Sequence, residues 1–264
     1  MAPRPPLLGQ GLAGLLLAFV LYGLEMLGQW PLLIGVVAVQ ALLVLGILAL
    51  LDAPAAGGIF YLGVGAGLAA DVVVLADEGR VDGLPAVVAL TLVAGLLHQL
   101  MRRDRQRVVE SLAATMVVVS LVCMTAVLAA SSEHGSWPLR IALAAAGATL
   151  LAGRVGDRFL PGPAIALAAT RRWPGLGLAL LAGLGAAVLV GRGNVESSQA
   201  ALIGLVAVSV VAGIDLALDL AATELTPSHD DARRVAALRP VAVLLPFAAL
   251  APIVLLVMRL LKDT

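Results

Sequence analysis

Two aspartates, Asp215 and Asp219, lie one helical turn apart in the stretch "AGIDLALDLAATEL" (residues 212 to 225), within a long apolar run. Their i, i+4 spacing puts both carboxylates on one face of a helix. A carboxylate well inside a membrane span costs about 2.5–3.5 kcal/mol on the lenient insertion scale, and such acids commonly form functional sites. The pair could share a cation, a water-filled cavity or a facing arginine. Alternatively, protonation or an arginine from an inner loop neutralises Asp215 for packing alone.

Arginines form the second group of candidates. Arg171 and Arg172 in "ATRRWPG" come immediately before an apolar run, and Arg158 lies in "GRVGDRF". Guanidinium groups suit phosphate because they are planar and always charged, so these residues could bind a lipid headgroup. They could equally be ordinary basic anchors at the membrane surface. His229, in the polar stretch after the two aspartates, is assigned to the same candidate polar site as Asp215 and Asp219.

The composition indicates the environment of these groups. Hydrophobic residues make up 61% of the chain and charged residues 13%, whereas soluble domains are about 45–50% apolar and about 25% charged. The sequence therefore predicts a multi-pass integral protein of the cell membrane, with membrane lipids as its surroundings. Aromatic residues amount to 3%, too few for stacking bases, so a nucleic-acid partner is not expected. The single cysteine, Cys123, excludes an internal disulfide and a cysteine-based metal site.

A spanning helix needs about 20 mostly apolar residues, and Trp/Pro, Gly/Pro and charge clusters divide the chain into such stretches. The fold class expected is an all-α, polytopic membrane helix bundle that forms one domain of about nine transmembrane helices. The spans are near 7–28, 31–51, 56–76, 84–101, 109–130, 138–153, 174–191, 199–222 and 239–261. Residues 154–173 contain an apolar core too short to cross, and we interpret them as a re-entrant or interfacial element.

The distribution of positive charge predicts the orientation, because Lys and Arg concentrate in cytoplasmic loops. With a cytoplasmic N-terminus, twelve of the seventeen basic residues fall on the inner side: Arg4, Arg102, Arg103, Arg105, Arg107, Arg154, Arg158, Arg171, Arg172, Arg233, Arg234 and Arg239. Five fall outside: Arg80, Arg140, Arg192, Arg259 and Lys262. The acids Glu25 and Asp71 lie towards the outer ends of their spans, where we expect them to be interfacial.

Several enzyme classes lack their motifs in this sequence. No P-loop, no zincin pair of histidines and no G-x-S-x-G elbow occurs. No soluble domain is visible either. Any chemistry must therefore take place at the membrane face or within the bundle.

The order of features resembles the phosphatidate cytidylyltransferases, also called CDP-diacylglycerol synthases. The resemblance rests on "TRRWPG", then "GIDLALDL", then "PSHDDARR" before the last span. The family reads approximately S-P-K-K-T-W-E-G, G-D-L-x-E-S-x-x-K-R and P-G-H-G-G-x-x-D-R-x-D in the corresponding places. By this resemblance Arg171 and Arg172 fall on the lysine pair, Asp215 on the aspartate of G-D-L, and His229 on the histidine of the last motif.

This chain departs from the family pattern at several charged positions. Asp219 replaces a serine, Ala222 and Thr223 replace Lys-Arg, and Arg234 replaces the aspartate linked to the metal. The family joins phosphatidate to CTP with Mg²⁺, which needs acids for the metal and cations for the phosphates. The expected function is therefore a protein that has lost catalysis and binds a phospholipid headgroup, such as that of an anionic phospholipid, or a partner protein at its cytoplasmic face.

Two alternatives stay open. The chain could be a proton- or cation-coupled transporter of a small molecule or lipid, with Asp215 and Asp219 as its coupling groups. It could also be a divergent but active CTP-dependent enzyme, in which case Mg²⁺ is the expected cofactor.

Overall fold

The computed structural model describes residues 7–53, 55–102, 107–133, 136–159, 173–224 and 231–262. Within these ranges the fold is all-helical, with nine α-helices and no strand. The helices are α1 (Leu7–Leu27), α2 (Gln29–Leu51), α3 (Ala56–Ala76), α4 (Leu84–Met101), α5 (Val108–Glu133), α6 (Ser136–Phe159), α7 (Trp173–Gly191), α8 (Ser197–Glu224) and α9 (Asp231–Lys262).

Each of these helices is long and apolar enough to cross a bilayer. Large apolar side chains cover the outside of the bundle. Tyr61 is 76% exposed, Leu181 72% and Leu90 71%. Such extensive apolar surface is unfavourable in water and favourable against lipid tails. The chain is a multi-pass membrane protein, as predicted from its composition.

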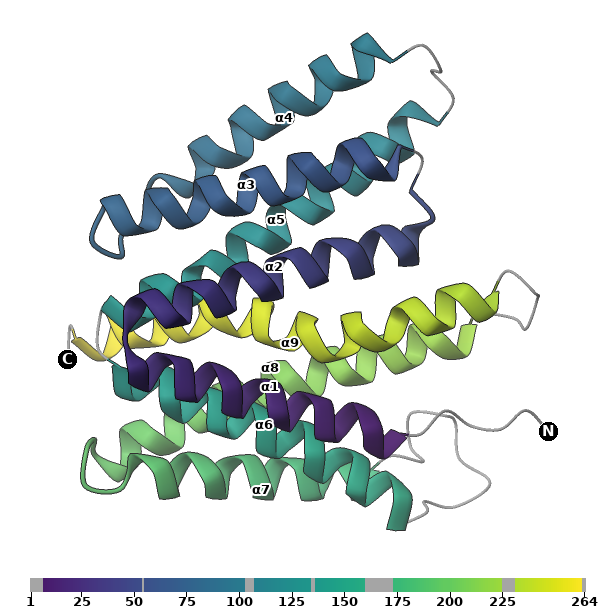
Figure 1. Ribbon diagram of the computed structural model, residues 1–264. Helices are drawn as coiled ribbons and strands as arrows, with labels where there is room; N and C mark the ends of the chain where they lie inside the picture. Colours follow the sequence, from purple (N-terminus) through teal and green to yellow (C-terminus); the bar gives the residue numbers. More distant parts are fainter. Residues whose placement is uncertain are drawn as a thin grey trace.

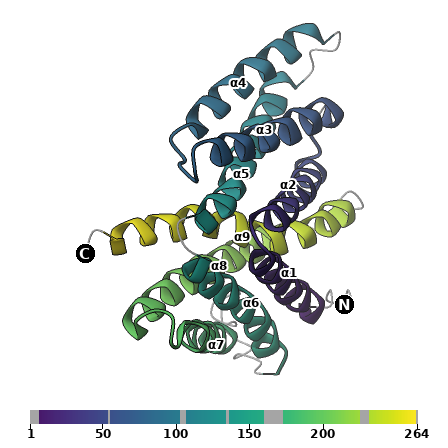
Figure 2. The same cartoon turned by 60° about the vertical axis from the view of Figure 1, so that its left-hand side comes forward.

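Consecutive helices run in alternating directions, so the bundle has two ends (Figure 1). We call the end where α1 begins the N-side and the opposite end, where α9 finishes, the C-side. Helix α9 lies in the middle, in contact with α2 and α5 on one face and with α8 on the other. Helices α3 and α4 extend beyond α5, while α6 and α7 extend beyond α8, and the turned view in Figure 2 separates these two groups.

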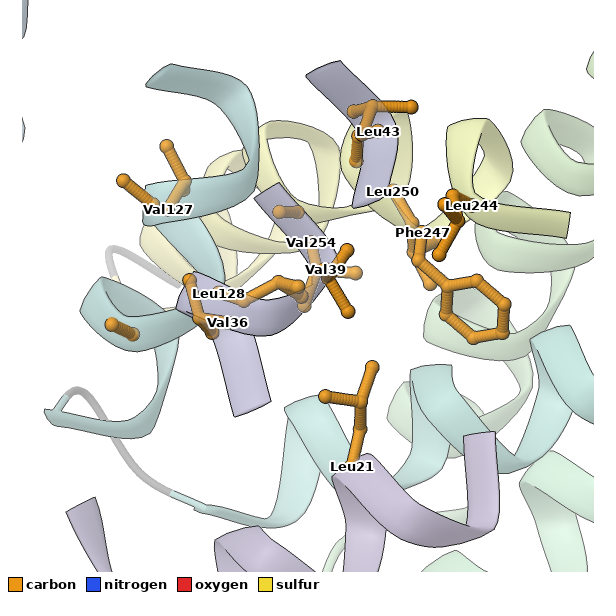
Figure 3. Close-up of a cluster of buried hydrophobic side chains, with 14 of the residues drawn as sticks. Leu21, Val36, Val39, Leu43, Val127, Leu128, Leu244, Phe247, Leu250 and Val254 are labelled. Atoms are coloured by element: carbon orange, nitrogen blue, oxygen red, sulfur yellow. The ribbon is translucent and has the colours of Figure 1, made fainter. Parts of the chain in front are cut away.

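The apolar core lies where α1, α2, α5 and α9 meet. Figure 3 shows Leu21, Val39, Leu128 and Phe247 among the side chains gathered there. Phe247 has no exposed surface. Most other core residues are Val, Leu and Ala, whose small or compact side chains allow membrane helices to approach closely. This core fixes the central helices and thereby the positions of α6 and α8, which carry the candidate site.

Helix α6 differs from its predicted span of 138–153. It continues to Phe159, so Arg154 and Asp157 lie on the helix and not in a re-entrant or interfacial element. The first proline after Arg154 is Pro161, and nothing before it interrupts a helix. Of the element predicted at 154–173, residues 160–172 lie outside the described ranges.

Candidate functional site

Arg154 of α6 joins both intramembrane aspartates of α8. Its guanidinium donates through Nη2 to Oδ1 of Asp215 and through Nη1 to Oδ2 of Asp219, the latter over 3.3 Å. The Arg154 side chain is only 3% exposed, against 18% for Asp215 and 23% for Asp219. We call these three residues the Arg154 triad. The i, i+4 spacing on α8 therefore serves to present two carboxylates to one arginine.

The depth of the triad makes its pairing energetically necessary. Asp215 lies six residues inside the end of the candidate span Ser197–Ala221, which corresponds to about 9 Å along the helix. A charge buried at that depth without a partner is strongly unfavourable, whereas charge-assisted hydrogen bonds to a planar guanidinium recover part of the desolvation cost. Arg154 is thus the facing arginine that the sequence left open as one explanation of Asp215 and Asp219.

A small cavity lies beside the triad between α6, α7 and α8. It has a volume of about 30 Å³, and its polar lining includes Thr149, Asp157 and Asp215. This volume is enough for one or two water molecules. The Thr149 hydroxyl donates to the Ala145 carbonyl over 2.7 Å. The cavity therefore has room for water beside Asp157 and Asp215, and most of the remaining lining is apolar.

Helix α7 closes the cavity by packing very tightly on α6. A Cβ atom added to Gly156 would lie 2.5 Å from the Cα atom of Gly175, and one added to Gly175 would lie 2.9 Å from the carbonyl oxygen of Gly153. The same added atom on Gly175 would collide with the Asp157 carboxylate. Small residues at these positions let the two backbones touch. The position of Asp157 depends on this contact.

The other predicted site residues do not join the triad within the described ranges. Arg158 is exposed, one turn beyond Arg154 at the N-side end of α6. Arg171, Arg172 and His229 lie outside the described residues. Among the residues that the structure describes, no group of three or more His, Cys, Asp or Glu side chains is placed to hold a metal ion.

Arg154 was predicted to begin a re-entrant or interfacial element on the inner side, whereas the structure places it within α6. The helix that carries it has no proline between Pro138 and Pro161. A longer span would have put Arg154 at the same level of the membrane as Asp215 and Asp219. The missed signal was therefore the lack of a proline, because Gly153 and Arg154 by themselves resemble an ordinary helix end.

A second buried ion pair holds the opposite end of α6. Glu25 of α1 accepts a hydrogen bond from Nε of Arg140, and the guanidinium carbon of Arg140 lies 4.9 Å above the ring centre of Trp137. The Glu25 side chain is 3% exposed. Glu25 lies two residues from the end of the candidate span Leu8–Leu27, and at this level α1 and α6 cover the carboxylate while Arg140 compensates its charge.

An apolar groove runs along the N-side half of the bundle between α1, α2 and α9. Its volume is about 440 Å³, within the usual range of ligand pockets. The lining residues are Gly9, Gln10, Ala13, Leu17, Leu42, Arg239, Pro240, Val243 and Leu244. Among the described residues that line it, Arg239 is the charged one, and it is exposed.

No protein-family model, no curated protein and no solved structure matches this chain. The resemblance to the phosphatidate cytidylyltransferases therefore stays a prediction.

Proposed function

We propose that this multi-pass membrane protein binds an anionic phospholipid at its N-side, without turning it over. The groove between α1, α2 and α9 is the observation that carries the proposal. It combines an apolar channel with one cationic residue at its rim. A phospholipid has the complementary construction, with acyl chains joined to a charged headgroup.

The depth of the groove matches one leaflet. Gln10 and Arg239 lie at the N-side ends of the candidate spans Leu8–Leu27 and Leu238–Leu261. Leu17 lies nine residues into its span, or about 14 Å at the rise of an α-helix. Leu42 of α2 lies nine residues from the N-side end of its own helix. An acyl chain in the groove would thus reach nearly halfway across a hydrocarbon core of about 30 Å.

Charge favours an anionic over a zwitterionic headgroup. Among the described residues, no carboxylate forms an ion pair with Arg239, whereas Arg80, Arg107 and Arg140 each have one and Arg154 has two. Arginine binds phosphate well because its fork of donors matches the oxygens. With the cytoplasmic orientation expected for the N-side, the site would face the leaflet that holds the anionic lipids. Arg171 and Arg172 are further cationic candidates from the sequence alone.

Native mass spectrometry of the purified protein with phosphatidate and phosphatidylcholine tests the proposal. We expect R239Q to lower phosphatidate binding about tenfold and to leave phosphatidylcholine binding unchanged, since a hydrogen bond to a charged group contributes about 1.5–3 kcal/mol. Arg259 is an exposed arginine at the other end of the same helix, so R259Q is the matched control. Equal loss in both variants, or no preference for phosphatidate in the wild type, would contradict the proposal.

Further variants and one activity assay distinguish lipid binding in the groove from the alternatives. Ala13→Trp fills the groove and should weaken both lipids, whereas Leu16→Trp, at a lipid-facing position that is 62% exposed, should weaken neither. Arg171→Ala with Arg172→Ala should reduce phosphatidate binding further.

Incubation with CTP, phosphatidate and Mg²⁺ should release no pyrophosphate, and measurable release would instead favour the active-enzyme alternative.

Ion-coupled transport is the second candidate, and the Arg154 triad favours it. A proton on Asp215 would weaken its bond to Arg154 and leave the arginine with Asp219, which gives the α6–α8 contact two arrangements. The adjacent cavity would supply that proton. Membrane-embedded acids with an exchangeable partner are the usual parts of proton relays.

Asp215→Asn is expected to abolish pH dependence of transport, because asparagine cannot exchange a proton. The measurement is translocation of a fluorescent NBD-labelled phospholipid in proteoliposomes under an imposed pH gradient, read by dithionite quenching. Asp82→Asn is the control, since Asp82 forms an exposed pair with Arg80. If pH-dependent translocation persists in D215N, Asp215 does not have this role. The same conclusion follows if translocation by the wild type does not depend on pH.

A further inference from the structure

A second buried acid lies in the other half of the bundle, where α2, α3 and α5 meet. Asp71 of α3 and Gln40 of α2 are each 2% exposed. Nε2 of Gln40 donates to Oδ1 of Asp71 over 3.0 Å and to the carbonyl oxygen of Val122 over 3.3 Å. Asp71 lies five residues before the end of the candidate span Ala56–Ala76. The acid is enclosed by three helices.

The contact between Gln40 and Asp71 depends on a small residue on α3. A Cβ atom added to Gly67, one turn before Asp71 on α3, would lie 2.7 Å from Oε1 of Gln40. Glycine at this position leaves room for the head of the Gln40 side chain between α2 and α3. The amide is thus held in a defined place and gives Asp71 one neutral donor.

The two carboxylate oxygens of Asp71 differ in their hydrogen bonding. Oδ2 is buried and has no hydrogen-bond partner among the described residues. An ionised carboxylate in an apolar interior carries a very large desolvation cost unless a cation or several donors compensate it, whereas the protonated acid avoids that cost. One amide donor is much less than the two guanidinium contacts of the Arg154 triad.

The surrounding helices bring no cation to Asp71. Helix α3 packs on α2, α4 and α5. Helix α2 has no charged residue, α4 has only His98, and α5 has Glu110 and Glu133 at its ends with Cys123 between them. His98 packs against Gly58, thirteen residues before Asp71, or about 20 Å along α3. Cys123, next to Val122, is the titratable group beside the acid.

We propose that Asp71 is a proton-binding site. It holds a proton while α2, α3 and α5 are packed as described, and it releases the proton when these helices separate enough to admit water. This site lies on other helices than the Arg154 triad of α6 and α8, and it shares only α2 with the lipid groove, through Gln40 here and Leu42 there. Its ligand is a proton, and its consequence is that the packing of the α2–α3–α5 contact depends on pH.

Cys123 is the only cysteine in the chain and is buried at 6% exposure, so it reports opening of this contact without any engineered label site. The experiment measures the rate of maleimide labelling of the full-length protein from about pH 6 to about pH 9, in wild type and D71N. Both rates rise as the thiol ionises. We expect the ratio of wild-type to D71N rate to rise as well, by up to about tenfold per pH unit, the slope of a one-proton equilibrium.

The labelling experiment has a control variant and two outcomes that would contradict the proposal. D82N, which removes an exposed carboxylate, should follow the wild-type profile. A ratio that stays constant with pH would overturn the proposal. Replacement of Na⁺ by choline at constant ionic strength should leave the rates unchanged, and a Na⁺-dependent rate would identify a metal cation in place of the proton.

A measurement on wild-type protein alone covers the case in which D71N does not fold. Infrared spectroscopy should detect the carbonyl stretch of a protonated carboxylic acid at neutral pH, and this band should vanish over the pH range in which Cys123 labelling accelerates. A spectrum with no such band at neutral pH would show an ionised Asp71 and overturn the proposal.

Discussion

Arg154→Met is expected to destabilise the protein by about 3–5 kcal/mol, a loss large enough to prevent accumulation of folded protein. The substitution keeps an unbranched apolar stem but leaves Asp215 and Asp219 without the guanidinium that both contact. The remaining carboxylates would be stranded in the membrane between α6 and α8. The measurement is the yield of monodisperse protein in detergent, followed by thermal unfolding of what remains.

If unpaired buried charge causes this loss of stability, the triple variant R154M/D215N/D219N gives a stricter test. This variant has no charge to strand, so it should recover much of the lost stability even though the triad is gone. Arg158→Gln is the matched control, because Arg158 lies one turn away on α6 and is exposed. We expect it to change stability by less than about 0.5 kcal/mol. A stable R154M, or a triple variant as unstable as R154M, would contradict the assignment of a compensated buried charge.

Gly175→Ala is the second substitution for which we expect a large effect. Its new methyl group would meet the Asp157 carboxylate and lie 2.9 Å from the carbonyl oxygen of Gly153. The backbone oxygen cannot move aside as a flexible side chain can, so α7 must shift away from α6. Overpacking of this kind costs about 1–3 kcal/mol. Gly156→Ala should have a similar effect from the other helix, because its methyl group would lie 2.5 Å from the Gly175 backbone.

Gly177 supplies the control on the same helix. A Cβ atom added there meets nothing within 4 Å, so Gly177→Ala should be neutral or should stabilise by up to about 1 kcal/mol through its better helix propensity. Thermal unfolding of the two variants side by side distinguishes close packing from propensity. If G175A were as stable as G177A, the tight α6–α7 contact would not be present in solution.

Hydropathy predicted the helices well, for a physical reason. A chain segment in a bilayer must satisfy its backbone hydrogen bonds internally and must be about as long as the hydrocarbon core is thick. The run predicted at 31–51 is helix Gln29–Leu51, and the run at 199–222 lies within Ser197–Glu224. The all-helical, nine-span fold is confirmed for the described chain. The cytoplasmic orientation of the N-side stays a prediction.

The partners of the buried charges were harder to predict than the helices. The spacing of Asp215 and Asp219 correctly indicated a shared face, but Arg154 was placed at the start of a re-entrant or interfacial element because arginine commonly ends a span. Glu25 and Arg140 are 115 residues apart in the chain, and no local pattern connects them. Hydropathy describes each span separately, whereas an ion pair depends on which spans become neighbours.

Helix α6 carries both of these long-range pairs, one near each end, and this arrangement has a consequence for biogenesis. It is the least hydrophobic of the nine candidate spans, so it gains least from partitioning into the bilayer by itself. Glu25 is synthesised before α6 and can receive Arg140 as soon as that helix leaves the translocon. Asp215 and Asp219 are synthesised later, so Arg154 has no acidic partner on α8 until two more helices have been inserted. The candidate site is thus completed late in the assembly of the bundle, after the opposite end of the same helix can already be fixed.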